Sequence, residues 1–327
     1  MNKKIIILLY ISLYIVLNIN AQDAQFSQFY SNSLYLNPAF AGSDVNSRVS
    51  LNYRNQWIGA DASFATYSAS FDQYVDAVQG GVGLLVTDDD RGGFNTFNAS
   101  AMYSYKMNLS KKFSFSAGFQ TTYSQKKINW DNLVFPDMID PSLGVVNSTG
   151  ETPPNKLKKG FVDFSAGFIG YNKNSYFGLA VHHLTQPLES FEGKENYSNV
   201  LSTKFSLHFG TNIHIKNFRF RKGDLYLSPN IIFQQQRNFQ QINYGVYLHR
   251  RQFEAGLWLR QNLKPHFSSM VFLFGYNTDF YKFAYSYDFN ISYLSTRIIG
   301  AHELSFVIEF ERLKPKKKYR AIKCPSF

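Results

Sequence analysis

The sequence predicts an all-β fold: a transmembrane antiparallel β-barrel of about 14 strands that follows an N-terminal plug or hatch segment. Three observations lead to this prediction. Apolar and polar residues alternate along most of the chain. Aromatic residues make up 17% and charged residues also 17%, where soluble domains carry about 25% charged residues. Finally, short and long connections tend to follow one another in turn, as a barrel with short periplasmic turns requires.

The first element is a targeting sequence. Lys3 and Lys4 precede an apolar run from Ile5 to Leu17, and the small residue Ala21 ends the stretch. The apolar core is shorter than the roughly 20 residues that a membrane helix needs, which disfavours a transmembrane anchor. We therefore predict a signal peptide over residues 1–21, cleaved so that the mature chain begins at Gln22, and a final location in the outer membrane.

The second element, residues 22–45, is too irregular for a strand. Asn37-Pro38 favours a turn, and the segment carries several aromatic residues, Phe26, Phe29, Tyr30, Tyr35 and Phe40. That many aromatic side chains are too many to leave in water. The segment is expected to fold against the barrel as a partial plug or a periplasmic hatch.

The third element is the barrel itself, expected over residues 46–312. Period-two alternation predicts strands with one lipid-facing and one lumenal face. Pro229 and a run that is apolar on both faces make two strands less regular. The expected strands lie near 46–57, 62–73, 79–88, 94–109, 112–124, 161–171, 175–184, 202–216, 224–235, 239–249, 252–261, 267–278, 281–289 and 301–312.

The charges sort between the two sets of connections. Asp88, Asp89 and Asp90 fall in an expected outer turn, whereas basic residues gather in the expected periplasmic turns and in a basic tail over residues 313–327. Such a rim is either solvated turn chemistry or a surface that steers a partner. The formal net charge of +11 does not imply nucleic acid, which an exported protein rarely meets. The partner-docking candidates are Arg219, Arg221, Lys222, Arg250, Arg251, Lys316, Lys317 and Lys318.

No pattern indicates a catalytic residue, a cofactor or a metal site. His182-His183 and His302-Glu303 are adjacent pairs, and neighbours on a strand point to opposite faces. Asp88-Asp89-Asp90 lacks the spacing of a dedicated Ca²⁺ loop. Glu303 and Asp288 are expected to face the lumen on neighbouring strands, where acid-base chemistry is conceivable, but a polar lumenal lining is far commoner.

Several motifs resemble the PorP/SprF membrane proteins of the type IX secretion system of Bacteroidetes. They run from Gln25-Phe26-Ser27-Gln28 near the mature N-terminus to Cys324-Pro325-Ser326-Phe327 at the end. Between these lie the stretches at residues 35–42, 53–57, 183–187, 287–294 and 300–303. The motif residues assigned to the plug and its surroundings are Gln25, Phe26, Ser27, Gln28, Leu36, Asn37, Pro38, Ala39, Gly42, Tyr53, Arg54, Gln56 and Trp57.

The resemblance implies a non-enzymatic component of the outer membrane, surrounded by its lipid. Members assist the secretion or surface attachment of cargo that bears a C-terminal sorting domain, including adhesins for gliding, and associate with a periplasmic ring that contains a lipoprotein. Two alternatives remain open at this stage. One is an outer-membrane transport channel for small or hydrophobic solutes, and the other is a barrel hydrolase that uses His302, Glu303 and Asp288.

Overall fold

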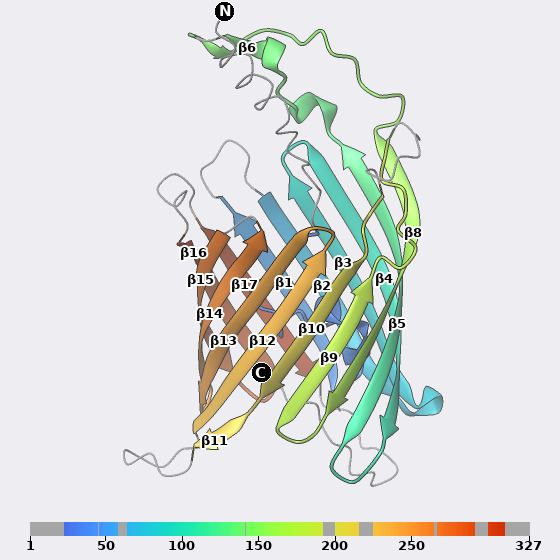
Figure 1. The fold of residues 1–327 in the computed structure, drawn as a ribbon, viewed down its shortest axis with the longest axis vertical. Helices are drawn as coiled ribbons and strands as arrows, with labels where there is room; N and C mark the ends of the chain where they lie inside the picture. The colour runs from blue at the N-terminus through green and yellow to red at the C-terminus, as the bar shows by residue number, and fades with distance from the viewer. Residues whose placement is uncertain are drawn as a thin grey trace, which may run out of the picture.

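Fourteen antiparallel strands form a wall that closes on itself (Figure 1). Each strand pairs with its neighbour in the sequence, β1 pairs with β17, and β10 pairs with β12, so no wall strand is left without two neighbours. Closure satisfies the backbone hydrogen bonds of every strand within the sheet, which a lipid environment demands. The fold is therefore the predicted all-β barrel.

The structure is a computed structural model. It describes residues 23–44, 46–57, 64–140, 142–191, 200–215, 225–264, 267–291 and 300–310. The expected signal peptide (residues 1–21), the whole of the expected basic tail (residues 313–327) and several docking candidates lie outside these residues. The candidates concerned are Arg219, Arg221, Lys222, Lys316, Lys317 and Lys318.

The wall strands are β1 (Ser47–Gln56), β2 (Phe64–Val75), β3 (Gly80–Arg91), β4 (Phe94–Asn108), β5 (Ser114–Ile128), β8 (Lys158–Tyr171), β9 (Ser175–His182), β10 (Lys204–Thr211) with its continuation β11 (Ile213–Ile215), β12 (Leu225–Gln236), β13 (Phe239–Arg250), β14 (Phe253–Lys264), β15 (Phe267–Asn277), β16 (Tyr281–Asn290) and β17 (Ala301–Phe310). A small hairpin, β6 (Ile139–Asp140) and β7 (Gly144–Val145), lies in the loop before β8. The helices are α2 (Ser33–Leu36) and the 3₁₀ turns η1 (Pro38–Phe40), η2 (Asp76–Val78), η3 (Trp130–Asn132) and η4 (Pro136–Met138). Within the described ranges no helix is long and apolar enough to cross a membrane.

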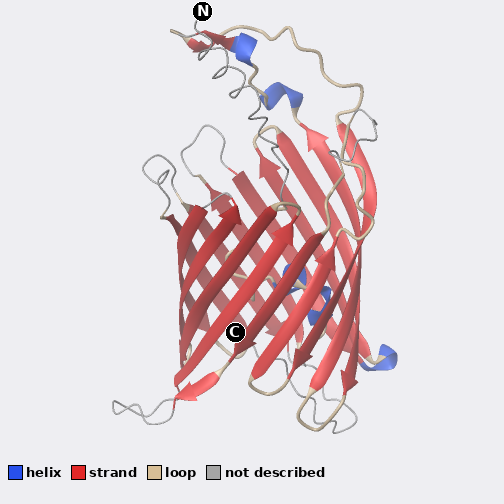
Figure 2. Ribbon diagram, in the orientation of Figure 1, coloured by secondary structure: helices blue, strands red, loops and turns tan. Residues whose placement is uncertain are grey.

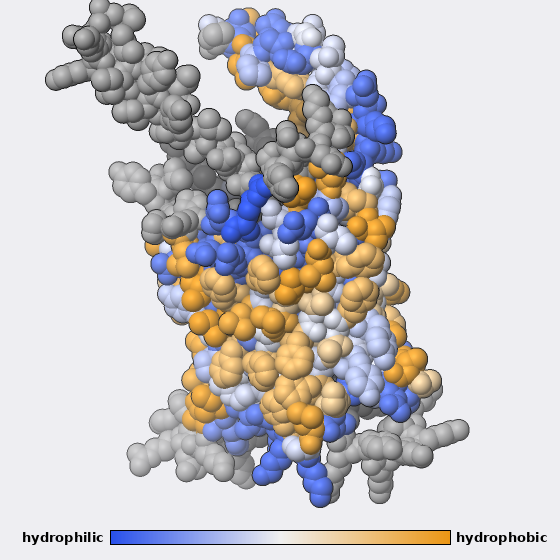
Figure 3. All heavy atoms as spheres, turned by 45° about the vertical axis from the view of Figure 1, so that its right-hand side comes forward, coloured by the Kyte–Doolittle hydropathy of each residue, from blue (hydrophilic) through white to orange (hydrophobic). Residues whose placement is uncertain are grey.

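The wall is polar inside and apolar outside. On β2, Thr66, Ser68 and Ser70 are buried, while the alternating Tyr67 and Phe71 are exposed. Apolar side chains accordingly form a band across the face of the barrel that Figure 3 shows. Since side chains alternate along a strand, one sequence pattern supplies both a lipid-facing surface and a hydrophilic lumen.

All fourteen predicted strands are present, with two differences. The expected strand 202–216 is interrupted at Asn212, next to Thr211, which lies opposite Pro229 of β12. Proline has no backbone N–H to donate, so the ladder breaks there and resumes at Ile213. The expected acidic outer turn is wrong, because β3 continues through Asp88–Asp90 and turns Asp89 into the barrel, where it accepts from Thr66.

The connections divide between two ends, which Figures 1 and 2 show at opposite rims. The short-turn end holds the connections at residues 76–79, 109–113, 172–174, 251–252 and 278–280. The long-loop end holds the connections 129–157 and 183–203. This separation agrees with the predicted tendency of short and long connections to lie at opposite ends. Positions in the lumen are described below relative to these two ends.

Candidate functional site

The N-terminal segment (residues 23–44) runs inside the wall from the long-loop end to the short-turn end. Asp23 contacts His183, which directly follows β9 at the long-loop end. The N–H of Gly42 donates to Asp72 over 3.0 Å, close to the short-turn end of β2. Figure 2 shows the two short helices of the segment enclosed by the strands. Nearly all of its side chains are buried or half-buried.

Four charged side chains from four strands meet on the inner wall, and we call them the ionic cluster: Arg54 on β1, Arg260 on β14, Asp288 on β16 and Glu303 on β17. Arg54 donates to Asp288 over 2.8 Å and to Glu303 over 3.2 Å, and Arg260 donates to Asp288 over 2.9 Å. None of the four is more than 5% exposed. Burying an ion costs several kcal/mol unless it is paired, and two cations here balance two anions.

Ser27 connects the N-terminal segment to all four members of the ionic cluster. Its hydroxyl donates to Asp288 over 2.7 Å and accepts from Arg54 and Arg260, each over 2.7 Å. Its backbone N–H donates to Glu303 over 2.6 Å. A serine suits this position because one hydroxyl group both donates and accepts.

Gln28 extends the attachment along β16 and β17. Its N–H donates to Glu303 over 3.1 Å, and its side-chain amide donates to the backbone carbonyl of Glu303 over 2.9 Å and to Ser286 over 3.2 Å. Its amide oxygen accepts from Ser305 over 2.5 Å. The ionic cluster therefore holds a polypeptide segment, and three of its four carboxylate oxygens are committed to that task or to arginine.

A second attachment lies at Asn37, at the start of η1. The side-chain amide of Asn37 donates to the carbonyls of Phe168 and Leu179 over 3.2 and 3.1 Å and lies 3.1 Å from Nε2 of His208. Its oxygen accepts from the N–H of Ala39 over 2.9 Å, which forms the turn predicted for Asn37-Pro38. The amide thus links strands β8, β9 and β10 to the segment.

Glycines on the inner wall let the segment approach the strands closely. A Cβ added at Gly118 of β5 would lie 2.4 Å from the backbone nitrogen of Ala39, and one at Gly167 of β8 would lie 1.9 Å from the side-chain oxygen of Asn37. Side chains at these positions are sterically excluded while the segment is in place. Beyond η1, Gly42 adopts a φ of 58°, which favours glycine.

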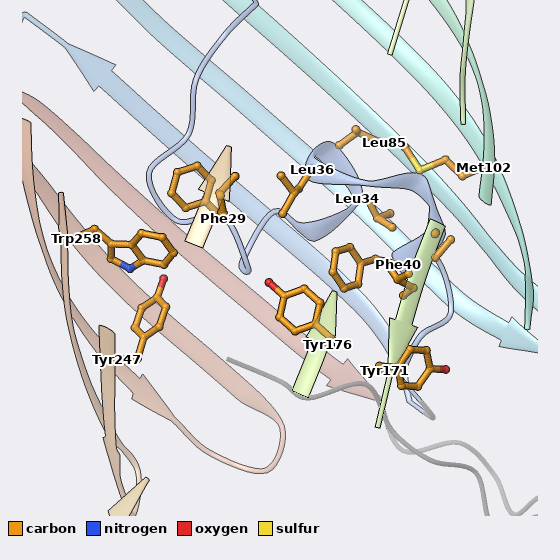
Figure 4. Close-up of a cluster of buried hydrophobic side chains, with 14 of the residues drawn as sticks. Phe29, Leu34, Leu36, Phe40, Leu85, Met102, Tyr171, Tyr176, Tyr247 and Trp258 are labelled. Carbon is orange, nitrogen blue, oxygen red and sulfur yellow. The ribbon is translucent and has the colours of Figure 1, made fainter. Parts of the chain in front are cut away.

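Apolar residues of the segment complete its packing. Phe29, Leu34, Leu36 and Phe40 lie against an apolar patch that interrupts the polar inner wall (Figure 4). The wall residues of this patch include Leu85, Met102, Ile169, Tyr171, Tyr176, Ile232, Tyr247 and Trp258. Each aromatic or aliphatic side chain buried in this way contributes about 1.5–3 kcal/mol.

His183 fixes the beginning of the segment between two carboxylates. Its ring nitrogens lie 2.9 Å from Asp23 and 2.7 Å from Asp163 of β8. Burial by itself lowers the pKa of His183, but the two carboxylates outweigh it and raise this pKa to about 9. The imidazolium is therefore the prevailing form at neutral pH. Lys204 also contacts Asp23, over 3.3 Å.

A family comparison matches residues 18–308 to the family described as "Type IX secretion system membrane protein PorP/SprF". The chain belongs to the PorP/SprF family. It is an outer-membrane β-barrel of the type IX secretion system and not an enzyme. No curated protein matches the chain.

Several solved structures are similar in fold. The CymD monoaromatic hydrocarbon channel is 12% identical, with 90% of this chain and 96% of that chain covered and a TM-score of 0.47. The toluene transporter TbuX of Ralstonia pickettii is 8% identical, with 85% and 93% covered and a TM-score of 0.47. A FadL homologue of Pseudomonas aeruginosa is 12% identical, with 86% and 94% covered and a TM-score of 0.43.

Motifs that are far apart in the PorP/SprF sequence meet in this structure. Ser27, Arg54, Asp288 and Glu303 come from four separate motif stretches and form one hydrogen-bonded group. Other motif residues lie elsewhere. Tyr53 faces outward and packs on Tyr67, with ring centroids 5.0 Å apart. The remaining members, Gln25, Phe26, Leu36, Pro38, Ala39, Gln56 and Trp57, lie inside the barrel or line its lumen.

Of the docking candidates, Arg250 and Arg251 are described. Both are exposed at the turn between β13 and β14, at the short-turn end, together with exposed Lys111, Lys112 and Lys173. The structure thus brings the described candidates to one rim of this family member.

Strand geometry splits the pair His302-Glu303, as expected, but it does not split His182-His183. His183 follows the end of β9 with a φ of 59°, so both histidine rings line the lumen, with centroids 6.4 Å apart. Glu303 faces the lumen, while His302 lies on the outer side and contacts the hydroxyl of Tyr285 over 2.7 Å. His182 is buried and contacts the carbonyl of Leu36, whereas His183 contacts Asp23 and Asp163. Among the described residues no group of three or more His, Cys, Asp or Glu side chains could hold a metal ion.

Sequence reasoning missed Arg260, His208 and the glycines Gly118 and Gly167. The position of Arg260 could have indicated an ion pair, because an arginine on the lumenal face of a membrane strand needs a partner. Its partner Asp288 was singled out for a different reason. The glycines carried no signal beyond small size, since only the position of the N-terminal segment shows why a side chain is excluded there.

Proposed function

We propose that this protein assists the secretion or surface attachment of cargo that bears a C-terminal sorting domain, gliding adhesins included, as a non-enzymatic part of the type IX secretion system. Within the barrel, the N-terminal segment acts as a plug that closes the lumen. The observation that carries the proposal is the attachment of Ser27 to the ionic cluster. A chain that passed solutes freely would not need its own N-terminus fixed across the lumen.

Three features support the plug. The segment is attached at three levels, through Asp23 near the long-loop end, through Ser27 and Gln28 at the ionic cluster, and through Gly42 near the short-turn end. Its apolar side chains cover an apolar patch that would otherwise face water. Finally, the wall positions that lie closest to the segment are glycines, so no wall side chain occupies the space that the segment fills.

The basic rim at the short-turn end is the proposed docking surface for the periplasmic ring and its lipoprotein. Arg250 and Arg251 are the described part of this surface, and Arg219, Arg221, Lys222, Lys316, Lys317 and Lys318 complete it in the sequence. Clustered charge of one sign steers a partner of opposite charge during association. The proposal places the short-turn end in the periplasm, because outer-membrane barrels have short periplasmic turns and longer extracellular loops.

Deletion of the gene tests the role in secretion. Surface-exposed proteins of the deletion strain and its parent are compared by mass spectrometry, with the intact gene restored on a plasmid as the control. Loss of one or a few proteins with C-terminal sorting domains from the surface, together with their retention in the cell or release to the medium, is expected. An unchanged surface proteome contradicts the proposal.

Docking is tested separately by charge reversal. Replacing Arg250, Arg251, Lys316, Lys317 and Lys318 by Glu should reduce the ring components that co-purify with the barrel at least tenfold. Replacing Lys126 and Lys127, at the opposite end, by Glu is the matched control and should leave co-purification unchanged. Undiminished recovery of the ring with the first variant removes the docking surface but not the role in secretion.

Planar-bilayer recording tests the plug against the alternative of a transport channel. A plugged barrel is expected to show almost no conductance, whereas a variant that lacks residues 23–44 should show a steady open pore. A steady conductance of the intact protein would contradict the plug and favour the channel for small or hydrophobic solutes.

A further inference from the structure

A cavity of about 800 Å³ occupies the long-loop half of the lumen. Its lining comes from the ends of β2, β3, β4, β5, β8 and β9 that lie nearest the long loops. The N-terminal segment contributes Asp23, Ala24 and Tyr35, so a molecule that enters from the long-loop end meets this segment. The volume falls in the range of about 300–1,000 Å³ that is typical of small-molecule sites.

Trp57 is turned into this cavity by an unusual backbone conformation. On β1, Arg54 and Gln56 face inward, so regular alternation would direct the next residue outward. Trp57 instead has a φ of 63°, and its ring packs on the inward-facing Phe64 with a centroid distance of 4.7 Å. A positive φ is costly for a bulky residue, and such strain is concentrated at functional sites.

Further aromatic rings surround the same opening. Phe94 at the start of β4 shares the inward face with Asn98 and Ser100 and is 50% exposed, and Phe161 on β8 shares the inward face with Asp163. The lumenal positions between these rings and the apolar patch are polar, namely Thr96, Asn98 and Ser100 on β4 and Asp163 and Ser165 on β8. The opening therefore presents apolar ring faces next to a hydrophilic wall.

That hydrophilic wall is a ladder of uncharged side chains on β3, β4 and β5. Asn98 donates to Thr87 over 3.1 Å and accepts from Ser124 over 2.6 Å. One step deeper, the amide of Gln120 donates to Ser100 and Thr122 over 3.1 and 2.9 Å. The side-chain oxygen of Gln120 is buried without a hydrogen-bond partner among the described residues. Hydroxyl groups and amides of this kind both donate and accept.

Apart from the exposed Lys127, the charged side chains of the lining that the structure describes are paired. Arg91 contacts Asp89 over 2.6 Å, and Lys126 contacts Glu189 over 2.5 Å. His183 and Lys204 contact the carboxylates of Asp163 and Asp23. A charged ligand that binds at these residues would have to break one of these pairs, whereas an uncharged ligand leaves them intact.

We propose that this cavity binds a neutral oligosaccharide. A sugar ring has a face of C–H groups, which packs on the electron-rich face of an aromatic ring, and a rim of hydroxyl groups, which both donate and accept. The aromatic opening and the uncharged ladder offer these two kinds of contact side by side. A purely apolar guest would instead leave the remaining donors and acceptors of these hydroxyls and amides without hydrogen bonds, which disfavours its binding.

The test uses the purified full-length barrel in a detergent that has no sugar headgroup. Isothermal titration calorimetry is run with four neutral probes, maltotetraose, cellotetraose, mannotetraose and chitotetraose, and with two comparison probes, tetragalacturonate and toluene. Saturable binding of at least one neutral probe, tighter than that of both comparison probes, is expected. Binding of none of the four, or tighter binding of tetragalacturonate or toluene, overturns the proposal.

Variants locate the binding in the cavity. Trp57→Ala should weaken the bound neutral probe at least tenfold, while Trp57→Phe, which keeps a ring, should weaken it less than threefold. Asn98→Ala, in the middle of β4, provides a second test that does not depend on the turn at Trp57 and should weaken binding at least threefold. Trp130→Phe, outside the lining, is the control, and equal affinity of all variants contradicts the site. Failure here leaves the role in secretion untouched, because the gene deletion tests that role independently.

Discussion

Arg54 donates to Asp288 over 2.8 Å although 234 residues separate them in the chain. The contact joins β1 to β16 across the inner face of β17, and Ser27 of the N-terminal segment completes it. The same residues that balance the charge of the inner wall therefore hold the segment in the lumen.

Removing one member of the ionic cluster should be strongly destabilising. Arg54→Ala leaves two buried carboxylates with one arginine, and we expect the free energy of unfolding to fall by about 3–5 kcal/mol. Urea unfolding in lipid vesicles measures the change. Arg250→Ala, at an exposed position, is the control and should change it by less than about 0.5 kcal/mol.

A double variant separates lost charge balance from lost packing. Arg54→Met combined with Glu303→Gln removes one cation and one anion, so it should recover part of the stability that Arg54→Met loses alone. A double variant that is less stable than the sum of the two single changes would contradict charge balance as the cause.

Filling the inner wall at a glycine should displace the N-terminal segment. Gly118→Val places atoms where the backbone of Ala39 lies, so we expect a measurable conductance in planar bilayers and faster protease cleavage of the segment. Gly275→Ala is the matched control, because its added Cβ would meet its neighbours at 3.4 Å, an ordinary contact distance. Equal conductance of both variants and the intact barrel would argue against displacement.

Stability should depend on pH through His183. The pKa of His183 is raised from 6.5 to about 9, so its ion pairs contribute fully below pH 6.5 and are lost as the pH rises through about 9. This difference in pKa corresponds to at most roughly 3 kcal/mol. Urea unfolding of the intact protein and of His183→Asn is compared at pH 6 and pH 10. The gap between them should be clearly larger at pH 6, and a gap independent of pH would contradict the pairing.

Substitution of leucine by lysine should destabilise the barrel where the side chain faces lipid, and should have little effect where it lies in a loop. Leu84 on β3 is 57% exposed and faces the apolar band, so Leu84→Lys should weaken folding into vesicles by about 2–4 kcal/mol. Leu143, 74% exposed in the loop between β5 and β8, gives the same substitution outside the wall. Leu143→Lys should cost less than about 0.5 kcal/mol, and equal losses would mean that Leu84 does not face lipid.

The wall could be predicted from the sequence because strand alternation is local and repeats fourteen times. Tyr67 and Phe71 alternate with Ser68 and Ser70 in the printed sequence as they do in the barrel. The contents of the lumen could not be predicted in the same way. The segment around Ser27 has no periodicity, and its partners on β14, β16 and β17 are identified only when the barrel is closed.

Two strands differ from the prediction, and each difference has its own physical reason. The sequence predicts that the third strand ends at Asp88, because three successive acidic residues are typical of a turn. In the structure, pairing with β2 and β4 extends β3 to Arg91. The break at Asn212 follows from Pro229 on the neighbouring strand, a cause that is not local in the sequence.

The attachment of Ser27 to Glu303 spans 276 residues, so it sets an order of events during biogenesis. Ser27 can meet Glu303 only once β17, the last strand of the described wall, is in place. Contacts between such distant parts of a chain are slow to form. Under the proposed plug role, closure of the lumen by the N-terminal segment is therefore completed late in assembly. A barrel that stalls before its last strand would lack the attachment of Ser27 to Glu303 as well as the pairing of β1 with β17.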